Sequence, residues 1–175
     1  LAAEWLEQHG EMDALVLAGH FHHGGDRERA ATCYLRVTET ANTTGDSDTT
    51  IEYARQGLAC EPTADIRIAL LGNLCEATAW KLNTPRDLVP QIEEMLEQAP
   101  LGSKQWLQGV FALSIFRFPQ YGELARFFDK MTRVTPPPNA VSFFVFLSGI
   151  ASAQLDFEGD TKHGDALLNR ARRTA

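Results

Sequence analysis

The sequence predicts an all-α protein, an antiparallel helical-hairpin solenoid of about ten helices. Three observations lead to this fold class. Apolar residues recur at the i, i+3, i+4, i+7 spacing of a helical face along most of the chain. No run of residues alternates between polar and apolar as a strand does. A layout of helix, tight break, helix and proline returns several times, and its clearest copy is Asp65 to Pro100.

Composition and charge narrow the class of protein. A hydrophobic content of 44% and a charged content of 22% are ordinary for a soluble globular chain of 175 residues. The net charge of −7 argues against nucleic-acid binding, which needs a surplus of Lys and Arg. The most apolar stretch, Val141 to Ala153, is shorter than the roughly 20 residues that a membrane span requires. We therefore expect a cytoplasmic chain with no nucleic-acid or membrane partner.

Cysteine usage and the chain ends add two expectations. The three cysteines, Cys33, Cys60 and Cys75, show no CxxC spacing, which favours reduced and buried thiols. The chain does not begin with Met and stops inside an apparent helix, so we expect it to be a fragment of a longer protein.

Capping and breaking residues set the helices of the first half. Predicted helices cover 1–9, 14–23 after Asp13, 27 to about 43 after Asp26, and a stretch from Asp48 or Thr49 to just before Pro62. Gly24-Gly25 and Gly45-Asp46 are the breaks between them. The third helix shows the clearest periodicity, with Ala30, Cys33, Tyr34, Val37 and Ala41 on one face.

Prolines set the helices of the second half. Thr63 and Asp65 begin a helix, Asn83-Thr84-Pro85 joins it to a partner with Pro85 in the first turn, and Pro100 closes the pair. Three more breaks, at Pro119, at Pro136-Pro137-Pro138 and at Gly159-Asp160, separate the remaining helices. Those helices are a Ser103-capped one to about Phe118, one over 120–133, a very apolar one from Asn139 to about Phe157, and one from Thr161.

The breaks recur with a period that indicates a repeat. Pro62, Pro100 and Pro136 each close a helix pair, at spacings of 38 and 36 residues. The approximate units are 11–44, 27–62, 63–100, 101–136 and 138–175, which together form one domain over 1–175. One such pair cannot bury its apolar face alone, so we expect successive pairs to stack.

The repeat resembles the tetratricopeptide family. The resemblance is carried by Ala18, Phe21, Gly25, Ala30 and Tyr34, by the Gly-Asp breaks, and by the closing prolines. Glu76 departs from the pattern, because it stands where the family favours a small residue for close helix packing. The stretches GDRERAATCYLRVTE (25–39) and IEYARQGLACEP (51–62) also look like the repeat region that follows kinase or ATPase domains in large bacterial signalling proteins. That likeness implies a regulatory or docking tail.

Several residues of the kinds used in catalysis or metal binding have a simpler structural interpretation. His20, His22 and His23 lack the further ligands of a metal site and suit a helix C-terminus. Glu93, Glu94 and Glu97 fit a solvated helix face, and no Ser-His-Asp, Cys-His or phosphate-loop pattern is present. We therefore expect no catalysis, no metal and no cofactor.

The resemblance also implies where a partner would bind. In a tetratricopeptide-like array the first helices of successive units line a concave face, and large aromatic residues and Arg dominate such interfaces. The candidate partner-binding residues are Asn73, Trp80, Lys81, Trp106, Phe116 and Arg117. The plainer interpretation is that the aromatic members fill the core, and three closely spaced phenylalanines, Phe143, Phe144 and Phe146, cannot all be exposed without a large apolar patch.

The sequence thus predicts a non-catalytic domain for protein–protein interaction or scaffolding, with a protein or peptide as its partner. One alternative is a homodimer formed through the apolar helix 141–157, to be tested by giving Phe144 and Phe146 a charge. The other is a small-ligand sensor with a pocket between helices near Trp80 and Trp106.

Overall fold

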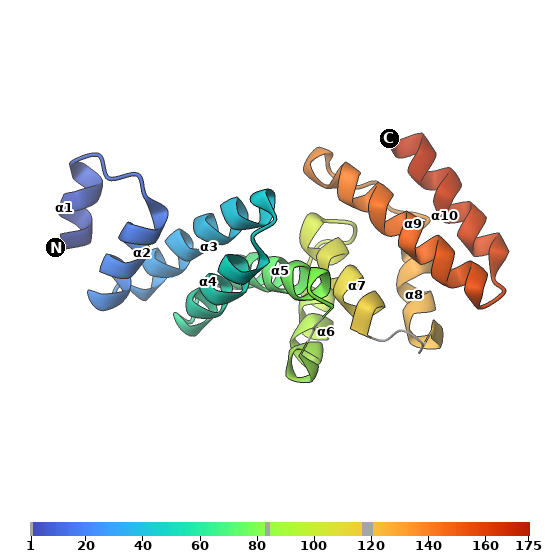
Figure 1. Cartoon of the computed structure of the whole chain (residues 1–175), viewed down its shortest axis with the longest axis horizontal. Helices are drawn as coiled ribbons and strands as arrows, with labels where there is room; N and C mark the ends of the chain where they lie inside the picture. The colour runs from blue at the N-terminus through green and yellow to red at the C-terminus, as the bar shows by residue number, and fades with distance from the viewer. Residues whose placement is uncertain (1, 83–84, 117–120) are drawn as a thin grey trace. The chain divides into compact units, whose positions relative to one another are not determined.

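The computed structural model describes residues 2–82, 85–116 and 121–175. Within these residues the chain forms ten α-helices, two short 3-10 helices and no strand (Figure 1). The prediction of an all-α fold with about ten helices is confirmed. The chain divides into two compact units, unit 1 (Leu1–Lys81) and unit 2 (Leu82–Ala175), and each is described by itself. Unit 1 holds 13 acidic and 6 basic residues, whereas unit 2 holds 10 of each, so the net negative charge belongs to unit 1.

Unit 1 is built from helices that pack on their neighbours in sequence. They are α1 (Ala2–Gln8), α2 (Ala14–His23), α3 (Arg27–Thr44), α4 (Ser47–Ala59) and α5 (Ala64–Trp80). Helix α3 contacts α2, α4 and α5, and α4 also contacts α5. Gly57 allows this close approach, because a Cβ there would lie 2.9 Å from Leu70 Cδ1 and 3.1 Å from Tyr34 Cβ. One core cluster of this unit comprises Leu17, Ala18, Phe21, Ala30, Ala31, Cys33, Tyr34 and Cys60.

The Gly-Asp breaks form the same turn three times. Gly25, Gly45 and Gly159 have φ values of 78°, 76° and 85°, a region that residues with a Cβ avoid. The N–H of the following aspartate donates to a carbonyl five residues back, with N–O distances of 3.0, 2.9 and 2.8 Å at Asp26, Asp46 and Asp160. Each aspartate then accepts from the backbone N–H three residues ahead and caps the next helix. The predicted breaks are therefore confirmed, and α4 is capped by Asp46, two residues before the predicted start.

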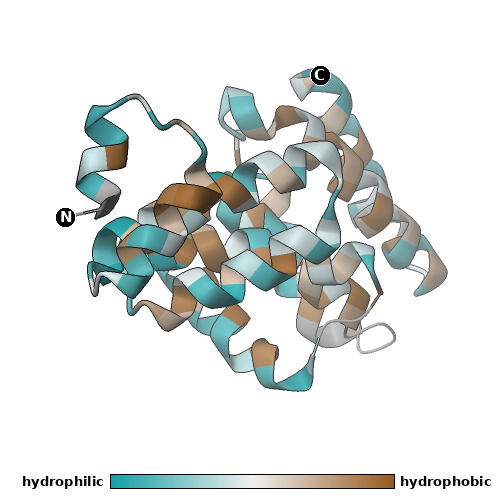
Figure 2. Ribbon diagram, turned by 60° about the vertical axis from the view of Figure 1, so that its left-hand side comes forward, coloured by the Kyte–Doolittle hydropathy of each residue, from teal (hydrophilic) through white to brown (hydrophobic). Residues whose placement is uncertain are grey.

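Unit 2 holds the remaining five α-helices. They are α6 (Val89–Gln98), α7 (Lys104–Phe116), α8 (Tyr121–Met131), α9 (Val141–Phe157) and α10 (Thr161–Thr174), with 3-10 turns at Arg86–Leu88 and Pro138–Ala140. Helix α7 contacts α6, α8 and α9, while α10 packs on α9 and touches α8. Most helices of the chain carry hydrophilic and hydrophobic residues together (Figure 2), as helices with one buried face do.

Two predicted helix starts are wrong, and a 3-10 turn explains both. Pro85 does not lie in the first turn of α6 but precedes the turn Arg86–Leu88, and Pro90 occupies the first turn. Asn139 does not cap α9, because it lies inside the turn Pro138–Ala140 and Ala140 takes the cap position. A 3-10 turn often precedes an α-helix, and it moves the cap by several residues. The predicted Asn83-Thr84 joint and the Pro119 break lie outside the described residues.

Helix α9 extends beyond the apolar stretch Val141 to Ala153 and ends at Phe157. The helical segment Pro138–Phe157 spans 20 residues and is, by length and composition alone, apolar enough to cross a membrane, so the expectation that it is too short is wrong. The same test is passed by core helices. In this structure Phe144, Leu147 and Leu155 are buried on α9, which contacts α7, α8 and α10.

Candidate functional site

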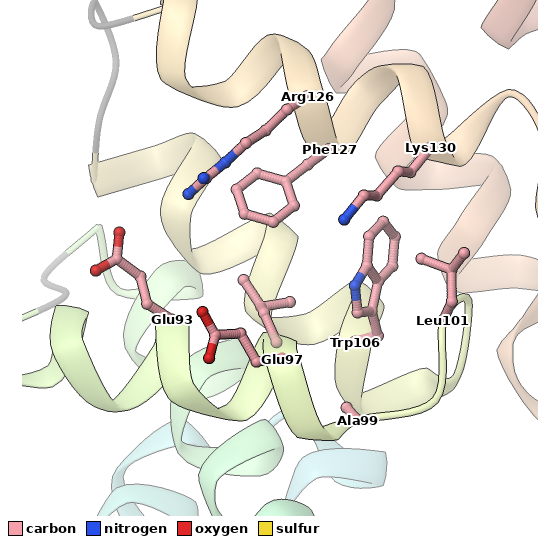
Figure 3. A pocket seen from close by; sticks show the side chains of 9 residues that line it. Glu93, Glu97, Ala99, Leu101, Trp106, Arg126, Phe127 and Lys130 are labelled. Atoms are coloured by element: carbon pink, nitrogen blue, oxygen red, sulfur yellow. The ribbon is translucent and has the colours of Figure 1, made fainter.

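Unit 2 carries a groove lined by residues that the structure describes. It has a volume of about 790 Å³ and lies among α6, α7 and α8 (Figure 3). The lining residues are Glu93, Leu96, Glu97, Ala99, Leu101, Trp106, Arg126, Phe127 and Lys130. Four of the nine are charged, so the groove differs from the mostly apolar pockets that enclose small ligands.

One wall of the groove is acidic and comes from α6. Ile92, Met95 and Leu96 are buried on the inner face of this helix. That orientation leaves Glu93 half-buried and Glu97 exposed, one turn apart on the side toward the groove. Residues four apart lie on the same face of a helix, about 6 Å apart along its axis. The acidic wall therefore presents its two carboxylates in a row.

The opposite wall is basic and comes from α8. Arg126 and Lys130 are exposed and also one turn apart, with Phe127 between them (Figure 3). The Arg126 guanidinium lies 4.7 Å from the centre of the Phe127 ring, and the Lys130 ammonium lies 5.9 Å from it. These are cation–π distances, and each contact is worth about 0.5–1 kcal/mol where the cation is exposed. Phe127 thus holds both cations over the groove.

The floor of the groove is aromatic. Trp106 packs edge-on against Phe127, with ring centres 6.3 Å apart at 63°, and only 1% of its surface is exposed. Ser103 fixes the start of α7 by accepting the Trp106 N–H at 3.2 Å, as the sequence predicted for this cap. Gly109 brings α7 close to α6, because a Cβ there would lie 2.7 Å from Met95 Cε and 3.0 Å from Leu96 Cδ2. Leu101, 56% exposed, supplies an apolar group at the surface.

The predicted partner-binding residues are divided between the two units, with Asn73, Trp80 and Lys81 in unit 1 and the others in unit 2. Asn73 is 3% exposed and Trp106 is 1% exposed, so the expectation that they present their side chains on an open face is wrong. Trp80 is 52% exposed, Lys81 is exposed and forms an ion pair with Asp48, and Phe116 is half-buried. Arg117 lies outside the described residues. Of the members of the set that the structure describes, only Trp106 lines the groove.

Asn73 is buried because it belongs to a polar network within unit 1. Its Nδ2 donates to Thr38 Oγ1 at 3.0 Å, and its Oδ1 accepts from Asn42 Nδ2 at 3.3 Å. Asn42 Nδ2 also donates to Glu76 Oε2 at 3.0 Å. The network links α3 to α5 and explains how Glu76 is accommodated at a position where a small residue was expected. Buried polar groups are usually hydrogen-bonded in this way.

The cysteines and the histidines near the end of α2 have structural roles. Cys33, Cys60 and Cys75 are free and buried, as predicted, and burial raises the pKa of all three thiols. His23 Nδ1 donates to the Gly19 carbonyl at 2.7 Å, and His22 Nδ1 lies 3.1 Å from the Tyr34 hydroxyl. Among the described residues no group of three or more His, Cys, Asp or Glu side chains is arranged to hold a metal ion.

The residues that define the groove were only partly found from the sequence. Glu93 and Glu97 were assigned to a solvated face, and Arg126 and Lys130 were not singled out. The signal in the sequence that could have revealed the groove is a pair of like charges four residues apart on each of two predicted helices. A comparison with known proteins finds no matching family model, no matching curated protein and no matching solved structure.

Proposed function

We propose that this chain is a non-catalytic protein-recognition domain, and that the groove of unit 2 receives a segment of a partner protein. The observation that supports this is the pairing of an acidic wall with a basic wall over an aromatic floor. Such a surface offers apolar contact at the exposed Leu101 and charge complementarity along its two walls, which together give specificity in protein interfaces.

The same proposal covers the architecture of the chain and the kind of protein of which it is a part. Within each unit the helices pack on their sequence neighbours, and three pairs two positions apart, α3 with α5, α7 with α9 and α8 with α10, also touch, as stacked helical hairpins do. We take the architecture to be tetratricopeptide-like, and the role to be a docking or regulatory region of a cytoplasmic bacterial signalling protein with a kinase or ATPase domain. The stretches 25–39 and 51–62 support that setting through the likeness stated above.

Peptide display tests the groove directly. A library of helical peptides of about 16 residues, a little over four turns, is selected on the whole chain, and dissociation constants of the recovered peptides are measured. Leu101→Glu changes an exposed residue that lines the groove, and Leu82→Glu changes a leucine of unit 2 that is 76% exposed and does not line it. We expect Leu101→Glu to weaken binding by about tenfold, or about 1.4 kcal/mol, and Leu82→Glu to leave binding unchanged. Equal effects of the two variants, or no recovered peptide, contradict the proposal.

A homodimer through α9 is the second candidate. It is supported by two phenylalanines on α9, Phe146 at 38% and Phe157 at 78% exposure. Phe144 is fully buried, so a charge there would unfold the helix packing and is unsuitable as a test. Light scattering on the unmodified chain and on Phe146→Asp separates the cases, because only a dimer held by this face would lose mass.

A further inference from the structure

The charges of the groove specify its occupant more closely, and this inference rests on the proposed function. We propose that the groove binds an amphipathic helix of another protein whose two flanks carry opposite charges. Its acidic flank lies along Arg126 and Lys130, its basic flank lies along Glu93 and Glu97, and its apolar side faces Leu101 and the aromatic floor.

The basic wall is prepared for carboxylates. Arg126 and Lys130 are both exposed, and among the described residues neither forms an ion pair with Glu97 on the facing wall. Their recorded contact is with the Phe127 ring, at 4.7 and 5.9 Å. An Arg–carboxylate pair is directional and charge-assisted, so an arriving carboxylate can replace this weaker contact without displacing an existing salt bridge. Moving the cations toward the partner would also uncover Phe127 for apolar contact.

The acidic wall makes the groove selective. It places Glu93 and Glu97 opposite the two cations, so the four charges of the lining cancel. A partner segment with one sign of charge gains at one wall and is repelled at the other. A segment with divided flanks is attracted at both walls, and this combination of attraction and repulsion is how interfaces reject wrong partners.

The spacing suits a helix. Each wall consists of two charges one helical turn apart on the edge of an α-helix. A helix laid between two others meets them with rows of residues at the same i, i+4 spacing, so its flanks can match both walls at once. Helix-in-groove binding of this kind uses apolar anchors at i, i+3, i+4 and i+7, which here would face the floor.

A second peptide library tests the charge rule, namely that the bound helix carries one acidic and one basic flank. The apolar face of the peptide is kept from the first selection, and the two flanks are randomised among Glu, Gln and Lys. Selection on the unmodified chain is expected to enrich peptides with one acidic and one basic flank, by at least about tenfold over peptides with two acidic flanks. Raising the salt concentration from about 50 mM to about 300 mM should reduce this preference, because exposed charges are screened.

Two matched variants of α6 identify the wall responsible. Glu97→Lys reverses a charge that lines the groove, and Glu94→Lys reverses an exposed charge on the same helix that does not line it. Glu97→Lys should shift selection toward peptides with acidic residues on both flanks, and Glu94→Lys should leave selection unchanged. If peptides with Gln flanks bind equally well and still depend on Leu101, the charge rule is overturned while the proposed function stands. If no peptide depends on Leu101, both are overturned.

Discussion

The polar network around Asn73 gives the sharpest test of unit 1. Asn73→Ala removes the hydrogen bonds to Thr38 Oγ1 at 3.0 Å and from Asn42 at 3.3 Å, each worth about 1 kcal/mol. The Thr38 hydroxyl keeps its bond to the Leu35 carbonyl, and Asn42 keeps its bond to Glu76, so neither loses its last partner. The cavity left at a position that is only 3% exposed adds about 1 kcal/mol. We therefore expect the free energy of unfolding to fall by about 2–3 kcal/mol.

Urea denaturation followed by circular dichroism measures this loss, and a double-mutant cycle assigns it. Thr38→Val keeps the side-chain shape and removes Oγ1, so the combined variant should show a coupling of about 1 kcal/mol with Asn73→Ala. Arg55→Ala, at an exposed position of α4, is the control and should change stability by less than about 0.5 kcal/mol. An additive cycle, or a loss below about 1 kcal/mol for Asn73→Ala, would refute the argument that this network ties α3 to α5.

Three further predictions concern the glycines and the thiols. Gly45→Ala should destabilise the chain by about 1–2 kcal/mol because φ is 76° there, whereas Gly19→Ala, in mid-helix with open space around the new Cβ, should stabilise it by about 0.5–1 kcal/mol. Thermal melts of the two variants that shift in the same direction would contradict this. Burial raises the pKa of the Cys75 thiol, so the unfolded chain loses this proton first, and stability should decline as the pH rises above about 8.5. Urea midpoints measured up to about pH 10 should show the decline, and Cys75→Ala should reduce it. Native Cys33, Cys60 and Cys75 should react with a thiol reagent at pH 8 far more slowly than in urea, and equal rates would show that they are accessible.

Local signals in the sequence were sufficient for most helix boundaries. Helix α2 covers Ala14–His23 as predicted, and α3 extends the prediction by one residue to Thr44. Both depend on Asp caps and glycines with positive φ, which act within a few residues and need no tertiary context. The starts of α6 and α9 were missed because the 3-10 turns before them depend on how the helix meets its neighbours.

The burial of single residues could not be read from repeat position alone. Trp106 was placed on an open face because the first helix of an ideal unit presents that position outward. In this chain α6 and α8 leave room above α7, and the indole fills it against Phe127. Asn73 was expected to meet a partner because polar residues are usually exposed. Its internal partners, Thr38 and Asn42, lie 35 and 31 residues away in sequence, and no periodicity indicates them.

The groove shows why charged sites between helices are hard to predict. In the frame set by Pro100 and Pro136, the positions equivalent to Glu93 and Glu97 are Asp129, on α8, and Arg133, just after α8 ends. These two residues form an i, i+4 ion pair of 2.9 Å. The charged groove-lining residues of α8 are Arg126 and Lys130, one helical turn earlier. A shift of one turn along a helix changes the sign of the charges at this wall from mixed to wholly basic. The charge pattern of the groove therefore depends on an offset between α6 and α8 that only the three-dimensional packing determines.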